Sequence, residues 1–397
     1  MIPRLKPAFG ASELLAALDV FRPHAVEQFE SGFAELAGQR HAIAFPYGRT
    51  SLLAIFKALG IKNRDVICPA YTCVVVPHAI VISGNRPVFV DSEAGDMNMD
   101  LALLDEAVTD ETAAIVSTSI FGHPVDLNAL DHVSAQNPDI PLLQDCAHSF
   151  FCDWDARPVH AAGLCAFFGL NISKIMSSIF GGMVTTDDDQ FADSLRSARA
   201  ELIAPSTMLK SLRRVFYLLA VYPAFTRLAY GTTNRMERSG LLNQFVKYYD
   251  PGIIDMPSDY LESLTPVEAR VGLAQCGAYP DIVRHRRRLA RIYREGLAED
   301  ERYRLPPDHT GCTYSHFVVR TGDAEMLCER ARRQGVQFGD LIEYHIPSMT
   351  AYADCRSFDR GVSGTLPGQV INLPVHRGCH EADARRIVDL LLSDSGS

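Results

Sequence analysis

The sequence predicts an α/β protein whose mostly parallel sheet is covered by helices on both faces. Between residues 50 and 190, short apolar runs alternate with segments of helical character. The apolar runs lack regular polar alternation, which is typical of strands that are buried on both faces. At 397 residues, the chain is also longer than one compact core usually spans, so we expect a large domain and a smaller one.

The local signals in this first part follow one another in a regular order. A helix over residues 50–59 ends at Gly60, a strand over 66–68 ends at Pro69, and a helix over 74–82 has Pro77 in its first turn. Further strands are predicted over 87–91, 113–117, 140–144 and 164–168, with helices over 101–108 and 127–135. This alternation is that of repeated strand–helix–strand units.

The second part of the chain departs from this rhythm. We expect a large domain over residues 1–200, an apolar and basic helical insert over 201–260, and a small α/β domain over 261–397. In the last of these, helices are predicted over 266–297, 324–334 and 381–392, and strands over 315–319 and 370–373.

Composition excludes several classes of function. The formal net charge of −10 argues against a nucleic-acid partner, which would require concentrated Lys and Arg. The ten cysteines form no CxxC pair and the thirteen histidines form no HExxH motif, so we expect reduced thiols and no metal site. No signal peptide or membrane-spanning segment is evident, which predicts a cytoplasmic protein.

Polar residues gather where the predicted strands end, which is where ligands bind in open α/β sheets. Asp145 ends the strand at 140–144, and Lys174 follows the strand at 164–168. His148 lies three residues after Asp145, and Tyr71 to Cys73 follow the strand at 66–68. Gly48, Arg49 and Thr50 precede a helix, whose free N–H groups and dipole favour an anion.

Taken singly, each of these residues has an ordinary structural role. An Asp at a strand end often caps a helix, a lone loop Lys is usually solvated, and His148 could simply begin a helix. Lys174, however, is flanked by Ile172, Ile175 and Met176, and loss of solvation favours the neutral, nucleophilic amine. A phosphate anchor, an Asp and a desolvated Lys at one sheet edge match the requirements of pyridoxal 5'-phosphate (PLP).

The order and spacing of these motifs resemble those of the DegT/StrS family of PLP-dependent aminotransferases over nearly the whole chain. The similar segments are Phe29–Ala34, Tyr47–Leu52, Pro69–Cys73, Val88–Asp91, Phe121–Asp126, Gln144–His148, Phe168–Lys174, Gly181–Thr185, Gly272–Gln275 and Ile371–His376. The segment Gln-Asp-Cys-Ala-His around Asp145 resembles the most telling family motif, Glu-Asp-Ala-Ala-Gln/His.

Five positions depart from the family pattern. The family serine that bonds the cofactor phosphate is Gly169 here, and the Asn and Arg that serve the neighbouring subunit correspond to Leu261 and Ser263. The aromatic residue that stacks on the cofactor ring is replaced by Cys73, although Tyr71 could take its place, and the acidic residue before Gly181 is Phe180. For the missing phosphate ligands, we expect Arg49 to supply the charge.

The resemblance implies a fold-type I aminotransferase and a homodimer. Lys174 would hold PLP as a Schiff base, and Asp145 would face its ring nitrogen. The amino group would pass from an amino-acid donor to a small keto substrate, expected to be a nucleotide-linked keto-sugar in the biosynthesis of surface glycans or secondary metabolites. Two alternatives remain: a non-sugar carbonyl (cyclitol, polyketide or lipid aldehyde), and a catalytically silent PLP-binding regulator.

The segment 206–250 is unlike ordinary family sequence. Residues 215–222 are apolar, and this run is expected to form a helix that is hydrophobic on every side. Basic residues outnumber acidic ones around this helix. The basic residues are Lys210, Arg213, Arg214, Arg227, Arg235 and Arg238. Two interpretations are open: a helical lid or subunit contact, or docking on an anionic membrane surface.

Overall fold

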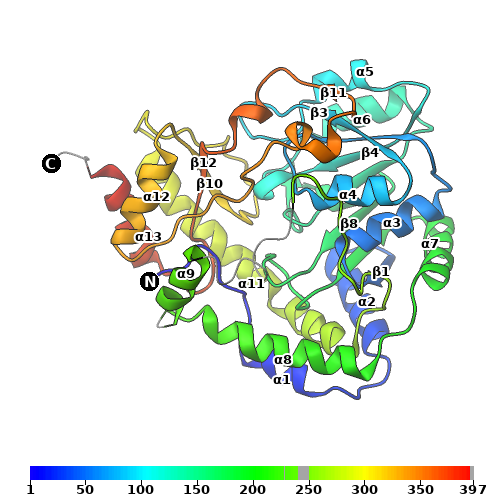
Figure 1. Ribbon diagram of the computed structural model, residues 1–397, viewed down its shortest axis with the longest axis horizontal. Helices are drawn as coiled ribbons and strands as arrows, with labels where there is room; N and C mark the ends of the chain where they lie inside the picture. Colours follow the sequence, from blue (N-terminus) through cyan, green and yellow to red (C-terminus); the bar gives the residue numbers. More distant parts are fainter. Residues whose placement is uncertain (228, 240–249, 394–397) are drawn as a thin grey trace.

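The central element of the fold is an eight-stranded sheet. A computed structural model describes residues 1–227, 229–239 and 250–393 (Figure 1). The strand order is β1-β9-β8-β5-β4-β2-β3-β11. The strands are β1 (His41–Phe45), β2 (Asp65–Pro69), β3 (Arg86–Val90), β4 (Thr112–Thr118), β5 (Leu142–Asp145), β8 (Cys165–Gly169), β9 (Gly182–Thr186) and β11 (Ser357–Phe358). Only the two pairings made by β9 are antiparallel, so the predicted mostly parallel sheet is confirmed.

Helices cover both faces of this sheet, as predicted. One face packs on α3 (Gly48–Ala58), α4 (Val75–Ile82) and α7 (Asp189–Leu202). The other face packs on α2 (Ala25–Ala37), α5 (Leu104–Ala107), α6 (Leu127–Gln136) and the first half of α11 (Pro266–Leu297). Each face has its own buried apolar cluster, and the continuous apolar strands follow from this double coverage.

The second half of α11 enters a smaller core. There it packs with β10 (Phe317–Arg320), β12 (Val370–Leu373), α12 (Ala324–Arg333) and α13 (Glu381–Leu392). The 32-residue helix α11 therefore joins the two cores, and it runs obliquely across the molecule in Figure 1. The C-terminal part also supplies β11, which pairs with β3 at the edge of the large sheet.

Three further helices belong to the N-terminal segment and to the region after α7: α1 (Ala11–Leu18), α8 (Met208–Ala224) and α9 (Tyr230–Arg238). Residues 215–222 belong to α8, in agreement with the predicted helix, and the protein covers this helix on one side only. Leu218 is buried, whereas Phe216 is 69% exposed on the opposite side of α8. Residues 228 and 240–249 of the segment predicted over 206–250 lie outside the described residues. In the part of the chain that the structure describes, no helix combines the length and the apolar character needed to cross a bilayer.

The sheet brings the predicted polar residues to one edge. Thr118, Asp145 and Phe167 lie side by side in register at the carboxyl ends of β4, β5 and β8. The N-terminus of α3 meets the same edge, because Tyr47 forms a bridge with Gly181 just before β9. A candidate site therefore lies at this carboxyl edge.

Candidate active site

The turn that begins α3 has the geometry of an anion-binding site. Tyr47 is extended, with φ −152° and ψ 154°, and its carbonyl accepts the first helical hydrogen bond, from Ser51. The N–H groups of Gly48, Arg49 and Thr50 consequently lack partners within the helix. Gly48 fits closely here, since a Cβ at this position would lie 2.9 Å from Cα of Gly169.

Side chains of this turn are held by the segment 255–260. The Thr50 hydroxyl donates to the carbonyl of Tyr260 at 2.9 Å, and Nη1 of Arg49 donates to the carbonyl of Asp255 at 3.1 Å. The Arg49 guanidinium also lies near His78, whose pKa falls to about 4 through burial first and this positive charge second. The role predicted for Arg49 in binding phosphate stays a prediction.

Asp145 is a buried carboxylate that accepts a hydrogen bond from the backbone N–H of Ala147 at 3.0 Å. Burial raises its pKa, while the Ala147 N–H, the charge of Lys174 and the Thr118 hydroxyl act in the opposite direction. A cationic group placed against this carboxylate would offset the cost of burying its charge.

Lys174 lies in the loop between β8 and β9, with its side chain turned back toward the end of β8. A Cβ built at Gly169 would lie 3.8 Å from Cε of Lys174 and 3.7 Å from Cβ of Ala147. The backbone N–H of Lys174 donates to Asn171 at 2.9 Å, and the neighbours Ile172, Ile175 and Met176 are buried as predicted. The Lys174 side chain therefore ends beside Gly169, close to the turn that begins α3 and to the segment that follows Asp145.

Two histidines stand beside these groups. His148 is buried, and its Nδ1 accepts from the backbone N–H of Phe121 at 3.3 Å, which leaves the proton of the neutral ring on Nε2. His316, from the segment before β10, has its ring centroid 5.2 Å from that of His148. Burial holds the pKa of both imidazoles well below the usual range, with the positive charge of Lys174 adding to the effect. His316 was missed by sequence analysis, which found no local signal for it.

Tyr71 and Cys73, the residues expected to cover the cofactor ring, lie between the carboxyl end of β2 and the start of α4. Tyr71 is 1% exposed, its ring packs edge-on against Phe121, and its hydroxyl has no hydrogen-bond partner among the described residues. Cys73 is half-buried just before α4. The Phe121 ring therefore lies next to both the Tyr71 ring and the His148 ring. The stacking of Tyr71 on the cofactor ring stays a prediction.

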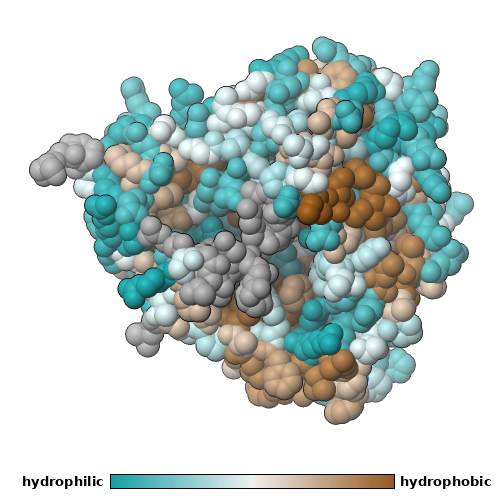
Figure 2. All heavy atoms as spheres, viewed as in Figure 1, coloured by the Kyte–Doolittle hydropathy of each residue, from teal (hydrophilic) through white to brown (hydrophobic). Residues whose placement is uncertain are grey.

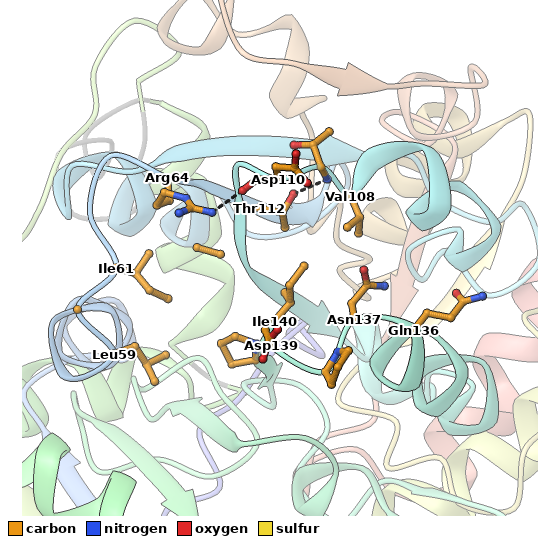
Figure 3. A pocket seen from close by; sticks show the side chains of 15 residues that line it. Leu59, Ile61, Arg64, Val108, Asp110, Thr112, Gln136, Asn137, Asp139 and Ile140 are labelled. Carbon is orange, nitrogen blue, oxygen red and sulfur yellow. Dashed lines mark hydrogen bonds between the residues drawn. The ribbon is translucent and has the colours of Figure 1, made fainter.

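A cavity elsewhere in the molecule does not carry this chemistry. It has a volume of about 770 Å³ and lies at the amino ends of β2, β4 and β5, opposite the candidate site. Its Arg64 donates to the backbone carbonyl of Asp110 at 2.5 Å, as drawn in Figure 3, and to that of Glu111 at 3.0 Å. Within the described residues, no cluster of three His, Cys, Asp or Glu side chains is arranged to hold a metal ion.

The residues at the carboxyl edge fit PLP. The free N–H groups at the start of α3 suit its phosphate, the buried carboxylate of Asp145 suits a protonated ring nitrogen, and the Lys174 side chain reaches the same sheet edge. Gly169 adds no side chain of its own here, and a Cβ at this position would make only ordinary contacts with Ala147 and Lys174. The donor set is thus complete except for the two phosphate ligands replaced by Gly169 and Leu261.

Comparison with known proteins gives a consistent result. Residues 14–392 match the profile of the DegT/DnrJ/EryC1/StrS aminotransferase family. GDP-perosamine synthase from Caulobacter vibrioides is 26% identical over 377 residues, which cover 92% of this chain and 89% of that protein. The sugar aminotransferase CalS13 from Micromonospora echinospora has the same fold, with a TM-score of 0.78 at 20% identity and coverage of 98% and 99%. DesI, solved with its TDP-sugar product, gives a TM-score of 0.76 at 22% identity and coverage of 98% and 91%.

Proposed function

The chain belongs to the DegT/DnrJ/EryC1/StrS aminotransferase family and is thus a PLP-dependent enzyme, and from this premise we propose that it aminates a nucleotide-linked keto-sugar. The observation that carries the aminotransferase chemistry is the placement of Lys174 near buried Asp145 at one sheet edge, with Lys174 Cε and Ala147 Cβ both beside Gly169. The sugar is inferred from GDP-perosamine synthase and from the TDP-sugar product of DesI. An amino acid is the proposed amino donor.

Four groups of this chain would divide the work. PLP, when bound, supplies an electron-accepting ring through which an amino group can be transferred. The N–H groups at the start of α3 would bind its phosphate, and Lys174 Nζ would attach it covalently and later move a proton at the substrate carbon. Asp145 would keep the ring nitrogen protonated, and the Nε2–H of neutral His148 would donate a hydrogen bond in the site.

The substrate assignment is tested by product formation. Purified enzyme should convert GDP- or TDP-linked keto-sugars to amino sugars when supplied with glutamate, as followed by mass spectrometry. The same panel should include a free cyclitol ketone and a long-chain aldehyde. Amination of either of these, with no reaction of the nucleotide sugars, would contradict the keto-sugar proposal.

We also propose that the enzyme works as a cytoplasmic homodimer. The support is the segment 255–263, which lies against the phosphate-binding turn and corresponds to the family segment that reaches the neighbouring subunit. Light scattering at micromolar concentration should give about twice the mass of the chain. A fully active monomer at that concentration would rule the dimer out.

Arg49→Ala should weaken PLP binding about 10- to 100-fold. The expected loss follows from removing one charge-assisted hydrogen bond, worth roughly 1.5–3 kcal/mol. Titration of the cofactor-free variant, followed by visible absorbance, measures the affinity. Arg64→Ala, at the opposite end of the sheet, is the matched control and should bind PLP like the wild type. An unchanged affinity for Arg49→Ala would assign the phosphate to backbone groups alone.

Gly169→Ser should tighten PLP binding by about 2- to 10-fold. The new Cβ meets only ordinary contacts at 3.7 and 3.8 Å, so the serine fits without strain, and one hydrogen bond to phosphate contributes roughly 0.5–1.5 kcal/mol. The contrasting variant is Gly48→Ala. Its Cβ would lie 2.9 Å from Gly169 Cα, so this variant should bind PLP more weakly than the wild type. Weaker binding by Gly169→Ser would show that the absence of a side chain at this position serves another purpose.

A further inference from the structure

The exposed apolar side chains of this protein are concentrated on two helices. Of the thirteen large apolar side chains that are exposed in the described residues, eight lie on α1, on the turn that follows it, or on α8. These eight define the α1–α8 face: Leu15, Leu18, Phe21, Met208, Leu209, Leu212, Phe216 and Leu219. Phe21 is 81% exposed and Phe216 is 69% exposed. Such clustering on a surface marks an interaction site, whereas scattered apolar residues need no explanation.

The two helices form one continuous surface. Their inner sides share a buried cluster with the first part of α11, and the Tyr222 hydroxyl of α8 donates to the Phe9 carbonyl just before α1 at 3.2 Å. Both helices lie along the lower edge of the molecule in Figure 1, and apolar side chains gather along the same edge in Figure 2. The face is therefore presented outward by a packed support.

Buried charges fix the orientation of α8. Arg214 donates to Glu268 at 2.8 Å and to Asp259 at 2.6 Å, and Nζ of Lys210 donates to the carbonyl of Glu262 at 2.7 Å. Two cations of α8 thus point into the protein, while Phe216 and its neighbours point outward. This is the reverse of the usual orientation of a surface helix, which turns its charges to water.

The charge that remains on the α1–α8 face is positive. Arg22 and Arg213 are exposed, and neither makes an ion pair with any described residue. Residues 11–22 and 208–224 contain two acids: Glu13 is buried against Gln275, and Asp19 pairs with Arg270 at 3.1 Å. An apolar, basic face on a chain of net charge −10 is complementary to an anionic apolar boundary.

We propose that the α1–α8 face docks the enzyme on an anionic lipid membrane, with α8 lying in the plane of the surface. An interfacial helix inserts aromatic and leucine side chains into the headgroup boundary, and neighbouring basic residues attract anionic lipid. A two-fold contact between copies of this face would instead place unpaired arginines against arginines without a free carboxylate to receive them. The proposal does not depend on the identity of the carbonyl substrate.

Docking at this face would take place next to the cofactor lysine. Ile172 and Ile179, on either side of Lys174, belong to the same buried cluster as Leu218 of α8. Phe180 packs on Tyr217 at 5.0 Å, and the Arg214 guanidinium lies 4.3 Å from the centre of the Phe180 ring. A membrane-docked α8 would therefore hold the Lys174 loop close to the lipid surface.

The experiment is co-sedimentation of the PLP-loaded enzyme with vesicles of phosphatidylglycerol and phosphatidylcholine, or of phosphatidylcholine alone, at low and high salt. The wild type should pellet with anionic vesicles and be released by salt. Phe216→Glu/Leu219→Glu should lower the partition coefficient at least about tenfold, and Arg22→Gln/Arg213→Gln should lower it about fivefold for each arginine. Met326→Glu/Leu392→Glu adds the same charges at exposed apolar positions of α12 and α13 and should bind like the wild type.

Two outcomes would overturn the proposal. In the first, wild-type enzyme stays in the supernatant with anionic vesicles at low salt. In the second, light scattering shows that Phe216→Glu/Leu219→Glu has a smaller assembly mass than the wild type, which would assign the face to a second copy of the chain. Circular dichroism of each variant confirms that the fold is retained before binding is compared.

Discussion

Replacing Lys174 by alanine should abolish amino transfer while leaving the protein folded, with a loss of rate of at least about 10³-fold. The expected size follows from removing both a covalent attachment and a general base, the latter alone contributing about 10²- to 10⁴-fold. Lys174 lies in a loop and is half-buried, and the apolar packing on either side of it comes from Ile172 and Ile175. Melting temperature and circular dichroism should therefore change little.

Chemical reduction of the wild-type enzyme identifies the attachment point directly. Borohydride reduction of wild-type enzyme should leave PLP irreversibly bound to the peptide that contains Lys174, as read by mass spectrometry. Lys57→Ala removes a surface lysine paired with Glu201 at 2.9 Å and should be labelled like the wild type. A small primary amine added to Lys174→Ala should restore part of the rate, because it can carry the same proton. Labelling of any other lysine would disprove the assignment.

Much of the fold follows from signals that lie close together in the sequence. The helices predicted over 266–297 and 381–392 are confirmed with the same bounds, as α11 and α13. Their local signals are a capping box of Thr265 and Glu268 at the start of α11 and the apolar periodicity of both helices. The parallel strands were recognisable as short apolar runs. Strand β1 (HAIAF), in contrast, was missed, because it precedes residue 50, where the recognised alternation of strands and helices begins.

The candidate site was predictable to the extent that its residues follow strands. Asp145 and His148 come from one strand end, and Lys174 follows the next strand of the sheet. His316 was not predictable, because it reaches His148 from 168 positions further along the chain and depends on how the C-terminal part packs on the sheet. No local pattern encodes such a contact.

The orientation of α8 shows a second limit of sequence reasoning. Composition indicated an apolar helix with basic neighbours, and the membrane interpretation placed these basic residues at an anionic surface. The structure buries Lys210 and Arg214 instead, because Asp259 and Glu268, more than 40 positions away, neutralise them. Partners so distant in sequence cannot be paired without the fold.

The largest effect besides that of Lys174 is expected from Asp145→Asn, which should lower the rate of amino transfer roughly 10³-fold. Asparagine has nearly the same shape and can still accept the hydrogen bond from Ala147. It carries no charge, however, and therefore cannot keep the cofactor nitrogen protonated, which is the electrostatic support that the reaction needs. Rate and PLP affinity should be measured on the same preparation.

Asp145→Asn should lower the rate but raise the stability of the cofactor-free protein. This combination would separate a role of Asp145 in binding the cofactor from simple damage to the fold. Burial raises the pKa of Asp145, so the folded cofactor-free wild type is penalised as the pH rises above the ordinary carboxyl range. Asp145→Asn removes this penalty, so its melting temperature without PLP should exceed that of the wild type at neutral pH and should match it at low pH. Saturating PLP should reverse the order, because the wild type binds the cofactor more tightly. A variant that is less stable than the wild type with and without PLP would show that Asp145 serves the fold rather than the cofactor.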